Sequence, residues 1–304
     1  MYDSHFWDQN RTETMSVTGL LITSYGPTGE ILADDGSLLT CHMRKNADPV
    51  ITGDRVSFDL QPDGTAIITG HLPRHSLLYR PPNKKKLIAA NIDCLITVAA
   101  PPALFSEDRI DRSIVAAHAL GLPALILLHK KDLLTGREKD SLTEKLQIYQ
   151  KAGFSTCESS TRIPEGMDLL REHLKGKSAV LTGPSGVGKS SIIAVLTGDT
   201  TIRTGDVSGQ GRGKHTTTAT RLYLLPGGGS LIDSPGIREF SLQDIDAESL
   251  FAGYPEFAPY EGKCRFRNCR HLAEPDCALV AASKKGEISA ERLSRYQNMA
   301  REIT

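Results

Sequence analysis

The stretch GPSGVGKS, residues 183–190, decides the fold class of this 304-residue chain. It satisfies the phosphate-loop pattern G-x-x-x-x-G-K-[S/T] at every fixed position. The apolar run SAVLTG leads into it and the helix-like run KSSIIAVLTG opens from it, so the stretch joins a strand to a helix, as the pattern requires. Backbone N–H groups at the start of such a helix converge on phosphate oxygens. The sequence therefore predicts an α/β domain that binds a nucleotide, and a chance glycine-rich turn is the weaker alternative.

The parts of this loop have predicted tasks. Lys189 is expected to contact the β- and γ-phosphates and to serve catalysis there, and Ser190 is expected to ligate Mg²⁺. The predicted phosphate contacts comprise Gly183, Pro184, Ser185, Gly186, Val187, Gly188, Lys189, Ser190 and Ser191.

The stretch DSPG, residues 233–236, ends the apolar strand SLI downstream of the phosphate loop. Taken alone, it predicts a turn. With Lys189 and Ser190 upstream, however, a carboxylate at this strand end suits a magnesium contact, and we expect Asp233 to make it. We expect Gly236 to donate its N–H to the γ-phosphate.

Between the phosphate loop and Asp233 lies GRGKHTTT, residues 211–218, whose composition favours a segment that orders around the γ-phosphate and Mg²⁺. Thr217 is the predicted magnesium ligand in it. Ras-type GTPases orient the attacking water with a Gln, but Ile237 at the corresponding position has no polar side-chain atom. His215 is therefore the candidate that positions the water. The alternatives are a flexible loop without a ligand and a histidine without a catalytic role.

A second motif, HKKD at residues 129–132, follows the apolar strand ALILL. It is similar to the guanine-recognition motif Asn-Lys-x-Asp, with His129 in place of Asn. The carboxylate of Asp132 can accept paired hydrogen bonds from N1 and N2 of guanine, a donor pair that adenine lacks. A solvated run of charges is the alternative. The predicted base contacts are His129, Lys130, Lys131 and Asp132, together with Ser159 and Ser160 after the strand-like run FSTCE.

The rest of the sequence predicts further domains, because a chain of this length is too long for one compact core. Residues 17–78 carry short apolar runs separated by Gly, Asp-Gly and Pro, which predicts a small β-barrel or sandwich. Strands then alternate with helices, as in a mainly parallel α/β sheet, and from about residue 242 the pattern is helical. The predicted division is a mobile extension at 1–15, a β-barrel at 16–80, the nucleotide-binding domain at 81–240 and a small, mainly α domain at 241–304.

The chain has six cysteines, and three of them cluster near its C-terminal end. Three thiolates and one imidazole within fourteen residues can form a closed tetrahedral zinc site of the structural kind. The predicted ligands are Cys264, Cys269, His271 and Cys277. A disulfide framework is disfavoured in a long, unsecreted chain. The isolated Cys41, Cys94 and Cys157 are expected to be small buried hydrophobic residues.

Charge and hydropathy limit the possible partners. Lys and Arg balance Asp and Glu, 36 against 36, so contact with a nucleic acid must come from local basic clusters. The candidates are Arg80 with Lys84, Lys85 and Lys86, and Lys263 with Arg265, Arg267 and Arg270; a solvated surface is the alternative for both. The N-terminus lacks the pattern of a signal peptide, and no apolar stretch is long enough to cross a membrane. We therefore expect a cytoplasmic protein without a membrane partner.

Taken together and in this order, HKKD, GPSGVGKS, GKHTTT, DSPGIREF and the Cys/His cluster resemble the RsgA (YjeQ) family of ribosome small-subunit-dependent GTPases over about residues 16–300. The resemblance implies an OB-fold β-barrel, a circularly permuted α/β P-loop GTPase domain and a zinc-binding domain. It also implies ribosome-stimulated hydrolysis of GTP, with Mg²⁺, and a late role in maturation of the small ribosomal subunit. The implied partners are that subunit, its ribosomal RNA, and GTP or GDP. We expect the chain to act as a monomer.

Permutation accounts for the order of the motifs, because His129 precedes Gly183 by 54 residues whereas the phosphate loop comes first in ordinary GTPases. The same sheet is cut and rejoined, so that its base-recognition half is translated first. The chain departs from the family pattern at three positions. His129 replaces the usual Asn, which predicts weaker but still guanine-selective binding because Asp132 is kept. Ser234 and Lys214 replace Thr and Arg.

Two other functions fit parts of the sequence. The first is an RNA-binding module with a regulatory, weakly hydrolytic nucleotide site. The second is a metabolic P-loop kinase, which needs an acceptor pocket that no part of the sequence indicates and which leaves the barrel and the zinc cluster without a task. Turnover stimulated by small ribosomal subunits distinguishes the GTPase from the RNA-binding module.

Overall fold

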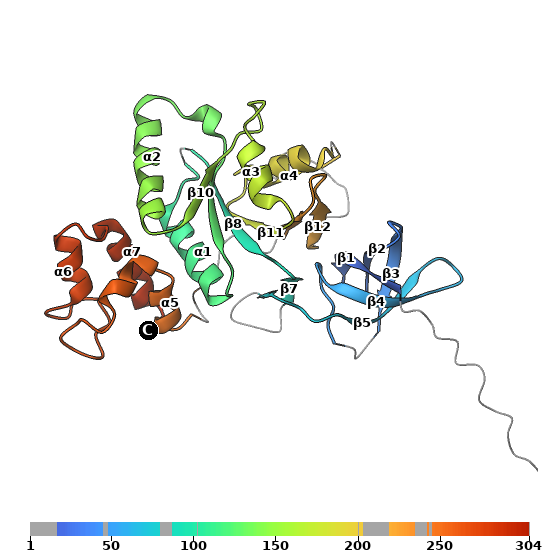
Figure 1. Cartoon of the computed structure of the whole chain (residues 1–304), viewed down its shortest axis with the longest axis horizontal. Helices are drawn as coiled ribbons and strands as arrows, with labels where there is room; N and C mark the ends of the chain where they lie inside the picture. The colour runs from blue at the N-terminus through green and yellow to red at the C-terminus, as the bar shows by residue number, and fades with distance from the viewer. Residues whose placement is uncertain are drawn as a thin grey trace, which may run out of the picture.

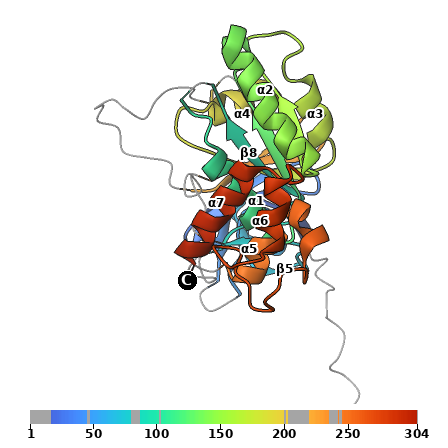
Figure 2. The same ribbon diagram turned by 90° about the vertical axis from the view of Figure 1, so that its left-hand side faces the viewer.

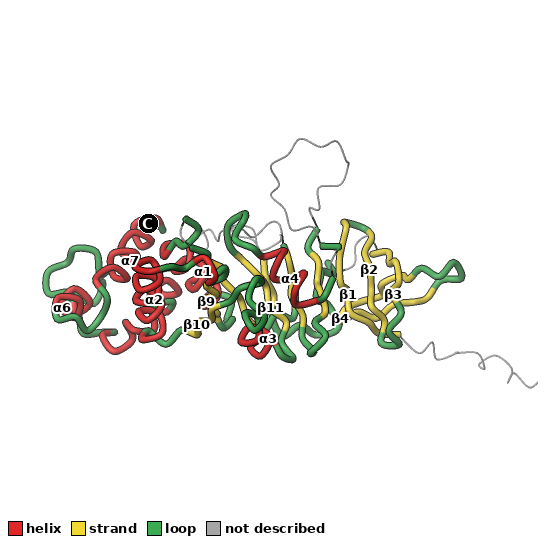
Figure 3. The backbone as a smooth tube through the Cα atoms, turned by 90° about the horizontal axis from the view of Figure 1, so that it is seen from above, coloured by secondary structure: helices red, strands yellow, loops and turns green. Residues whose placement is uncertain are grey.

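The computed structural model describes residues 17–44, 48–79, 87–101, 103–199, 201–202, 219–234, 242 and 245–303. These residues form an elongated body with a β-barrel at one end, a mostly parallel sheet flanked by helices in the middle, and a helical region at the other end (Figures 1 and 3). Nothing is described for residues 1–16 or 203–218, so the predicted mobile extension and the segment GRGKHTTT lie outside the described residues.

The barrel at the N-terminal end is built from five strands that close on themselves. Its strands are β1 (Val17–Tyr25), β2 (Thr28–Ala33), β3 (Leu38–Met43), β4 (Arg55–Leu60) and β5 (Ala66–His71). They pair in the order β1-β2-β3-β5-β4, and β4 pairs back with β1. Alternate residues of β2 are buried, as expected for strands with one face on a barrel core. The predicted β-barrel is thereby confirmed.

The central sheet has the strand order β10-β9-β8-β11-β13-β12. Its strands are β8 (Cys94–Ala99), β9 (Ala124–Leu128), β10 (Ser155–Glu158), β11 (Ser178–Thr182), β12 (Arg221–Leu224) and β13 (Ser230–Asp233). All neighbours pair in parallel except β12, which runs antiparallel to β13. Strands β8, β9 and β11 are near-continuous apolar runs because helices cover both faces of the sheet.

Alternate residues of the central strands pack on opposite faces. Ile96 and Leu127 share a core with the helices α3 (Asp168–Leu174) and α4 (Lys189–Thr197). Ile126 shares another core with α1 (Glu107–Ala119) and α2 (Gly136–Lys151). Parallel strands between two helical layers bring their carboxyl ends to one edge, where ligand-binding loops of open α/β sheets lie.

The barrel and the central sheet share one continuous ladder of hydrogen bonds, because β1 pairs with β12 at Thr23 and Arg221. The register of β1 against β2 shifts between Leu21 and Thr23, which marks a bulge. A bulge re-aims side chains. Leu21 accordingly lies in the barrel core, whereas Ile22 joins the core of the central sheet. A short ribbon of β6 (Leu77–Tyr79) and β7 (Leu87–Ala90) adds a second connection at this junction.

The C-terminal region is a small helical cluster that packs against α1 (Figure 2). It comprises α5 (Ala247–Ala252), the 3₁₀ helix η2 (Pro255–Tyr260), α6 (Ala278–Lys284) and α7 (Ala290–Glu302). Its core contains stacked Tyr254 and Phe257 rings with centroids 5.0 Å apart, and Tyr296 packs edge-on against both. Val115 of α1 belongs to the same core, so the helical cluster buries part of the central domain.

A buried ion cluster also joins α7 to α1. Arg292 is 1% exposed, and its guanidinium donates to Asp111, which is 0% exposed, over 2.7 Å. Arg295 donates to the other carboxylate oxygen of Asp111 over 2.6 Å, and Glu256 accepts from Arg292. The Arg292 guanidinium also lies over the Tyr254 ring, 4.4 Å from its centroid. Charges this deeply buried persist only when they are paired and hydrogen-bonded.

Most of these elements agree with the predictions from sequence. The strand predicted in SAVLTG corresponds to β11, the helix predicted in KSSIIAVLTG corresponds to α4, and the strand predicted in ALILL corresponds to β9. Helix α3 and the β6–β7 ribbon are not predicted by the sequence, because they are short and have no strong periodicity. Among the described residues, no helix combines the length and the apolar character needed to span a bilayer.

We predict that Arg292→Ala lowers the free energy of unfolding by about 3–5 kcal/mol. It removes one of the two arginine partners of the buried Asp111 carboxylate and also the arginine partner of Glu256. Urea unfolding of the full chain followed by circular dichroism measures this change. The matched control is Arg171→Ala, which removes an ion pair to Asp168 between side chains that are 47% and 60% exposed. The control should change the free energy by less than about 1 kcal/mol. Equal effects of the two substitutions would contradict the assignment.

Candidate functional site

The phosphate loop follows β11, which lies in the middle of the sheet between β8 and β13. Two positions of this loop require glycine, because neighbouring atoms lie too close to leave room for a Cβ. Gly183 has φ 138°, and a Cβ there would lie 2.5 Å from the carbonyl oxygen of Val98. Gly188 has φ 112°, and a Cβ there would lie 2.5 Å from Cδ2 of His129. Both positions therefore exclude a side chain.

Helix α4 begins at Lys189, directly after the loop. The Lys189 ammonium donates to the carbonyl oxygens of Gly183 and Pro184 over 2.7 and 3.0 Å, which holds it at the loop. Val187 is fully buried and anchors the loop in the core of the sheet, while Ser185 and Gly186 are exposed. The loop thus presents its backbone to solvent at the N-terminus of a helix, the geometry that favours anions.

Asp233 ends β13, the neighbour of β11, and pairs in register with Leu181. Burial raises the pKa of Asp233, and the positive charge of Lys189 opposes that rise. Lys189, at the start of α4, is therefore close enough to favour the charged carboxylate of Asp233. Ser234, which follows, is 4% exposed and accepts a hydrogen bond from Thr220 over 3.2 Å.

His129 connects three loops. It directly follows β9 and is 1% exposed, and its Nδ1 lies 2.8 Å from the hydroxyl of Ser159, which follows β10. The opposite edge of its ring lies against Gly188 of the phosphate loop. Burial, assisted by the charge of Lys130, lowers the pKa of His129 to about 4, so the imidazole is neutral near pH 7. A neutral ring can pack in this position without a buried charge.

The rest of the HKKD motif is held by its neighbours. Lys130 adopts a left-handed conformation and donates to the carbonyl oxygen of Gly186 over 2.8 Å, so this ammonium reaches the phosphate loop. Ser160 is fully buried and donates to Oδ1 of Asp132. The second carboxylate oxygen lies 3.9 Å from the exposed Arg162. A carboxylate has about four acceptor positions, so Asp132 can still accept the paired donors of a base.

The structure thus brings together residues that lie far apart in the sequence. His129, Lys130, Asp132, Ser159 and Ser160 contact one another or the phosphate loop around Gly186 and Gly188. Lys131 contributes its N–H to the carbonyl oxygen of Ser159. The Lys130 contact with Gly186 is an additional finding, because the sequence predicts only a contact of Lys130 with the base. His215, Thr217 and Gly236 lie outside the described residues.

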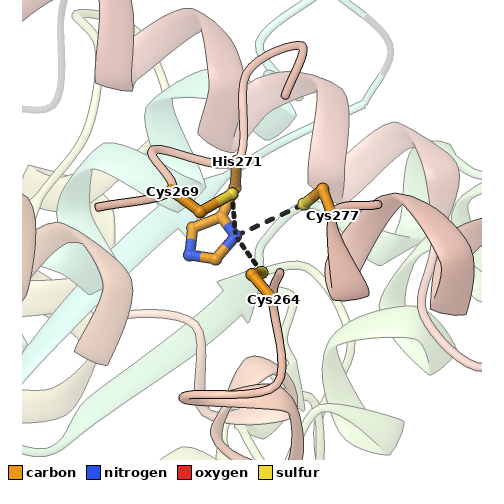
Figure 4. A group of neighbouring side chains, drawn as sticks. All are labelled: Cys264, Cys269, His271 and Cys277. Atoms are coloured by element: carbon orange, nitrogen blue, oxygen red, sulfur yellow. Dashed lines mark hydrogen bonds between the residues drawn. The ribbon is translucent and has the colours of Figure 1, made fainter. Parts of the chain in front are cut away.

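A second group of side chains gathers in the C-terminal region, where Cys264, Cys269, His271 and Cys277 converge (Figure 4). Their candidate ligand atoms all lie within 4.8 Å of one another. Nδ1 of His271 is 3.5, 3.7 and 3.4 Å from the three sulfur atoms. With Zn–S bonds of about 2.3 Å and Zn–N bonds of about 2.0–2.1 Å, a tetrahedral site has S···N edges of roughly 3.6 Å. The donor set therefore has the size of a tetrahedral metal site.

The surrounding backbone holds this group in place. The N–H of Ala278, at the start of α6, lies 3.3 Å from Sγ of Cys264. Gln297 of α7 donates to the carbonyl oxygen of His271 over 2.7 Å. Glu274 accepts backbone N–H groups of Arg270, Leu272 and Ala273; although its burial favours the neutral acid, these bonds lower the pKa of Glu274 to about 2. Such outer contacts orient metal ligands.

Comparison with known proteins agrees with this geometry. The family model described as RsgA GTPase matches residues 71–243. The protein named small ribosomal subunit biogenesis GTPase RsgA from Hahella chejuensis is 42% identical over 285 residues, which cover 91% of this chain and 82% of that protein. The protein of the same name from Marinobacter nauticus is 41% identical over 299 residues, which cover 94% of this chain and 84% of that protein.

Solved structures are similar along nearly the whole chain. The crystal structure of YjeQ from Thermotoga maritima superposes with a TM-score of 0.75 at 27% identity and covers 95% of this chain and 99% of its own. The structure of YloQ, described as a circularly permuted GTPase, gives a TM-score of 0.74 at 22% identity, with 97% and 98% covered. The predicted fold class, a barrel joined to a P-loop GTPase domain with a Cys/His cluster after it, is confirmed.

We predict that Asp132→Asn relaxes base selectivity from guanine toward xanthine, because one carboxylate oxygen becomes an NH₂ donor that suits the 2-carbonyl of xanthine. Competition of GTP, XTP and ATP against a fluorescent nucleotide measures the change. Asp140→Asn, an exposed substitution on α2, is the control and should leave selectivity unaltered. Equal affinity of the parent protein for GTP and ATP would remove the basis for this prediction.

We predict one bound metal ion per chain, measured by elemental analysis of protein purified without chelators. Cys269→Ser should lower the metal content to near zero, whereas Cys94→Ser, which alters a thiol of the central sheet, should not. Metal loss should unfold the C-terminal region locally while nucleotide affinity is largely retained, since a structural site stabilises the segment that carries its ligands. Metal-free parent protein with an intact C-terminal region would contradict this.

Proposed function

The chain belongs to the RsgA GTPase family, and on that premise we propose that it hydrolyses GTP to GDP and phosphate while it assists late maturation of the small ribosomal subunit. The observation that carries this proposal is the contact between the base-recognition loop and the phosphate loop, through Lys130 with Gly186 and His129 with Gly188. One nucleotide can bridge two loops that touch in this way. The relatives named above are GTPases, which favours this function over an RNA-binding module with a regulatory site.

Each residue of the site has a proposed task. The carboxylate of Asp132, held by Ser160, accepts the N1 and N2 hydrogens of guanine. His129 fixes the position of the HKKD loop, because its ring packs on Gly188 and bonds to the hydroxyl of Ser159. Lys189 exchanges its contacts with loop carbonyls for the β- and γ-phosphates, which is a charge-assisted and therefore stronger interaction.

Magnesium fits the donors at this end of the sheet. Asp233 supplies a half-buried carboxylate next to the phosphate loop, and Ser190 lies in the first turn of α4. We assign Ser190, Asp233 and Thr217 to the ion, which would neutralise charge on the phosphates. We assign Gly236 to the γ-phosphate and His215 to the attacking water, since Ile237 has no polar side-chain atom to hold it. A loop residue rarely holds the attacking water in productive geometry by itself. We therefore expect slow GTP hydrolysis until a partner orders the segment that contains His215.

Zinc is the proposed metal of the Cys/His cluster. Three thiolates and one imidazole at these separations suit tetrahedral Zn²⁺, and no fifth ligand position is needed in a structural site. The ion would cross-link the loop before α6 and stabilise the C-terminal region.

Ribosomal RNA is the proposed partner of the segment between the first two metal ligands. Its residues Arg265, Phe266 and Arg267 are exposed, and the Arg265 guanidinium lies 5.5 Å from the centroid of the Phe266 ring. Lys263 and Arg270 flank them. Exposed aromatic rings between arginines stack on unpaired bases while the cations contact phosphates. The second predicted basic cluster, Arg80 with Lys84, Lys85 and Lys86, lies outside the described residues and stays a prediction.

The remaining assignments are proposals of the same kind. We propose a cytoplasmic monomer divided at residues 15, 80 and 240 into the extension, the OB-fold barrel, the GTPase domain and the zinc-binding domain. The β1–β12 pairing and the buried Asp111–Arg292 cluster support a chain whose parts act together, since both cross these divisions.

The test is GTP hydrolysis by the full chain, measured with and without purified small ribosomal subunits. We expect slow turnover alone and strong stimulation by the subunits. Lys189→Ala should abolish tight nucleotide binding or hydrolysis in both conditions, and His215→Ala should bind nucleotide but lose most of the stimulation. Lys139→Ala, an exposed cation on α2, is the control.

Unchanged turnover in Lys189→Ala would overturn the assignment of the phosphate loop. Full stimulation of His215→Ala would place the water-positioning group elsewhere. A parent protein that small subunits neither bind nor stimulate would overturn the ribosomal role.

A further inference from the structure

Two buried threonines of the barrel bond to one carbonyl oxygen of the nucleotide-binding domain. Thr23 Oγ1 and Thr52 Oγ1 each lie 3.1 Å from the carbonyl oxygen of Thr220. Both threonines are 0% exposed. In the same place β1 pairs with β12, with Thr23 opposite Arg221. A carbonyl oxygen that accepts two enclosed hydroxyl donors is fixed in position relative to both.

The barrel side of this contact is stiff. Thr52 lies in the turn before β4, residues 51–54, which we call the barrel corner. Asp54 in this turn is fully buried and accepts two hydrogen bonds of 2.7 Å from Arg74. The N–H of Ala90 donates to the carbonyl oxygen of Thr52 over 2.9 Å, and a Cβ on Gly53 would lie 2.2 Å from the carbonyl oxygen of Ala90. The hydroxyl of Thr52 therefore moves only with the barrel corner that carries it.

The side chain of Thr220 contacts the nucleotide-binding domain near the end of β13. Its own hydroxyl donates to Oγ of Ser234 over 3.2 Å. Ser234 directly follows Asp233, the carboxylate assigned to magnesium, and precedes the segment that contains Gly236. Thr220 also comes two residues after Thr218, the end of the segment assigned to magnesium and water. One residue thus touches the barrel with its carbonyl group and the end of β13 with its side chain.

We propose that Thr220 is a positioning residue that couples contact at the barrel to hydrolysis at the nucleotide site. A shift of the barrel corner moves the Thr220 carbonyl through the hydroxyls of Thr23 and Thr52. The Thr220 side chain passes that shift to Ser234 and so to the end of β13. Because coupling between two sites is reciprocal, a change in the bound nucleotide also shifts the position of the barrel corner through the same bonds. The coupling rests on the proposed function, because it supplies a route by which a bound ribosomal subunit accelerates turnover.

The test removes the two barrel hydroxyls together. In the full-length double variant Thr23→Val, Thr52→Val, the hydrolysis rate without ribosomes and the affinity for GTP should stay within about twofold of the parent. In the part of the chain that the structure describes, the hydroxyls of both residues bond to Thr220 and not to the phosphate loop or the HKKD loop. Stimulation by small ribosomal subunits should fall by roughly 5-fold or more, the usual size of coupling between sites. The conservative pair Thr23→Ser, Thr52→Ser keeps the hydroxyls and should restore stimulation.

Thr69→Val is the matched control, because the Thr69 hydroxyl also donates to a carbonyl oxygen, that of Ser57, but within the barrel. It should be stimulated like the parent. A second measurement needs no ribosomes: amide hydrogen exchange of the barrel strands is compared between GDP and a non-hydrolysable GTP analogue. The parent should show a nucleotide-dependent change in β1 and around Thr52, and the Val double variant should not.

The outcomes separate the two proposals. A double variant that is stimulated like the parent, or that keeps the nucleotide-dependent change in exchange, overturns the coupling. A parent that is not stimulated by subunits overturns the ribosomal role, and the exchange measurement then decides the coupling alone. If the Val variant loses stimulation and the Ser variant loses it equally, the hydroxyls are not responsible and the coupling is overturned.

Discussion

The parallel pairing of β11 with β8 on one side and β13 on the other is the constraint on which the site depends. In this register Leu181 lies beside Ile96 and Asp233, so the loop after β11 emerges between the ends of both neighbours. Strand β9 adds its HKKD loop at the same edge. Hydrogen bonds between strands fix these neighbours regardless of the order in which the chain visits them. A permuted chain therefore builds the same site, and the base-recognition loop can precede the phosphate loop in sequence.

Local patterns predicted the parts of the molecule that depend on local chemistry. The phosphate loop, the buried strands, the barrel and the Cys/His cluster follow from residue types at short spacing. The contacts between distant segments could not be predicted in this way. Asp111 finds its partner Arg292 181 residues later, and nothing in the periodicity of α1 distinguishes a paired buried carboxylate from an exposed one. Lys130 was assigned to a base, but its reach to Gly186 depends on how two loops face each other.

The two junctions of the central domain differ in their chemistry. The junction with the C-terminal region depends on Asp111, Arg292 and Arg295, which are charged and enclosed. Separating them would expose uncompensated charges to an apolar interior, so that junction resists partial movement. The junction with the barrel includes neutral hydroxyl-to-carbonyl bonds at Thr220, each with a small net contribution of about 1 kcal/mol. Moving this junction exposes no uncompensated buried charge at these bonds, so the barrel can shift together with Thr220 at lower cost, which makes the barrel the more adjustable neighbour.

This difference assigns unlike tasks to the two ends of the molecule. Helix α7 carries Arg292, which bonds to α1, and Gln297, which bonds to the backbone of His271 in the metal-binding group. The loop with Phe266 is therefore held to α1 through one helix, and α1 is the next element of the chain after β8 of the central sheet. A surface fixed in this way suits a constant anchor on a partner, because binding to it costs little ordering. The barrel is connected instead through Thr220, which is close in sequence to the segment that we assign to magnesium and the attacking water. A partner that contacts both ends can thus be held by the metal-binding end while the barrel end changes position with the state of the nucleotide.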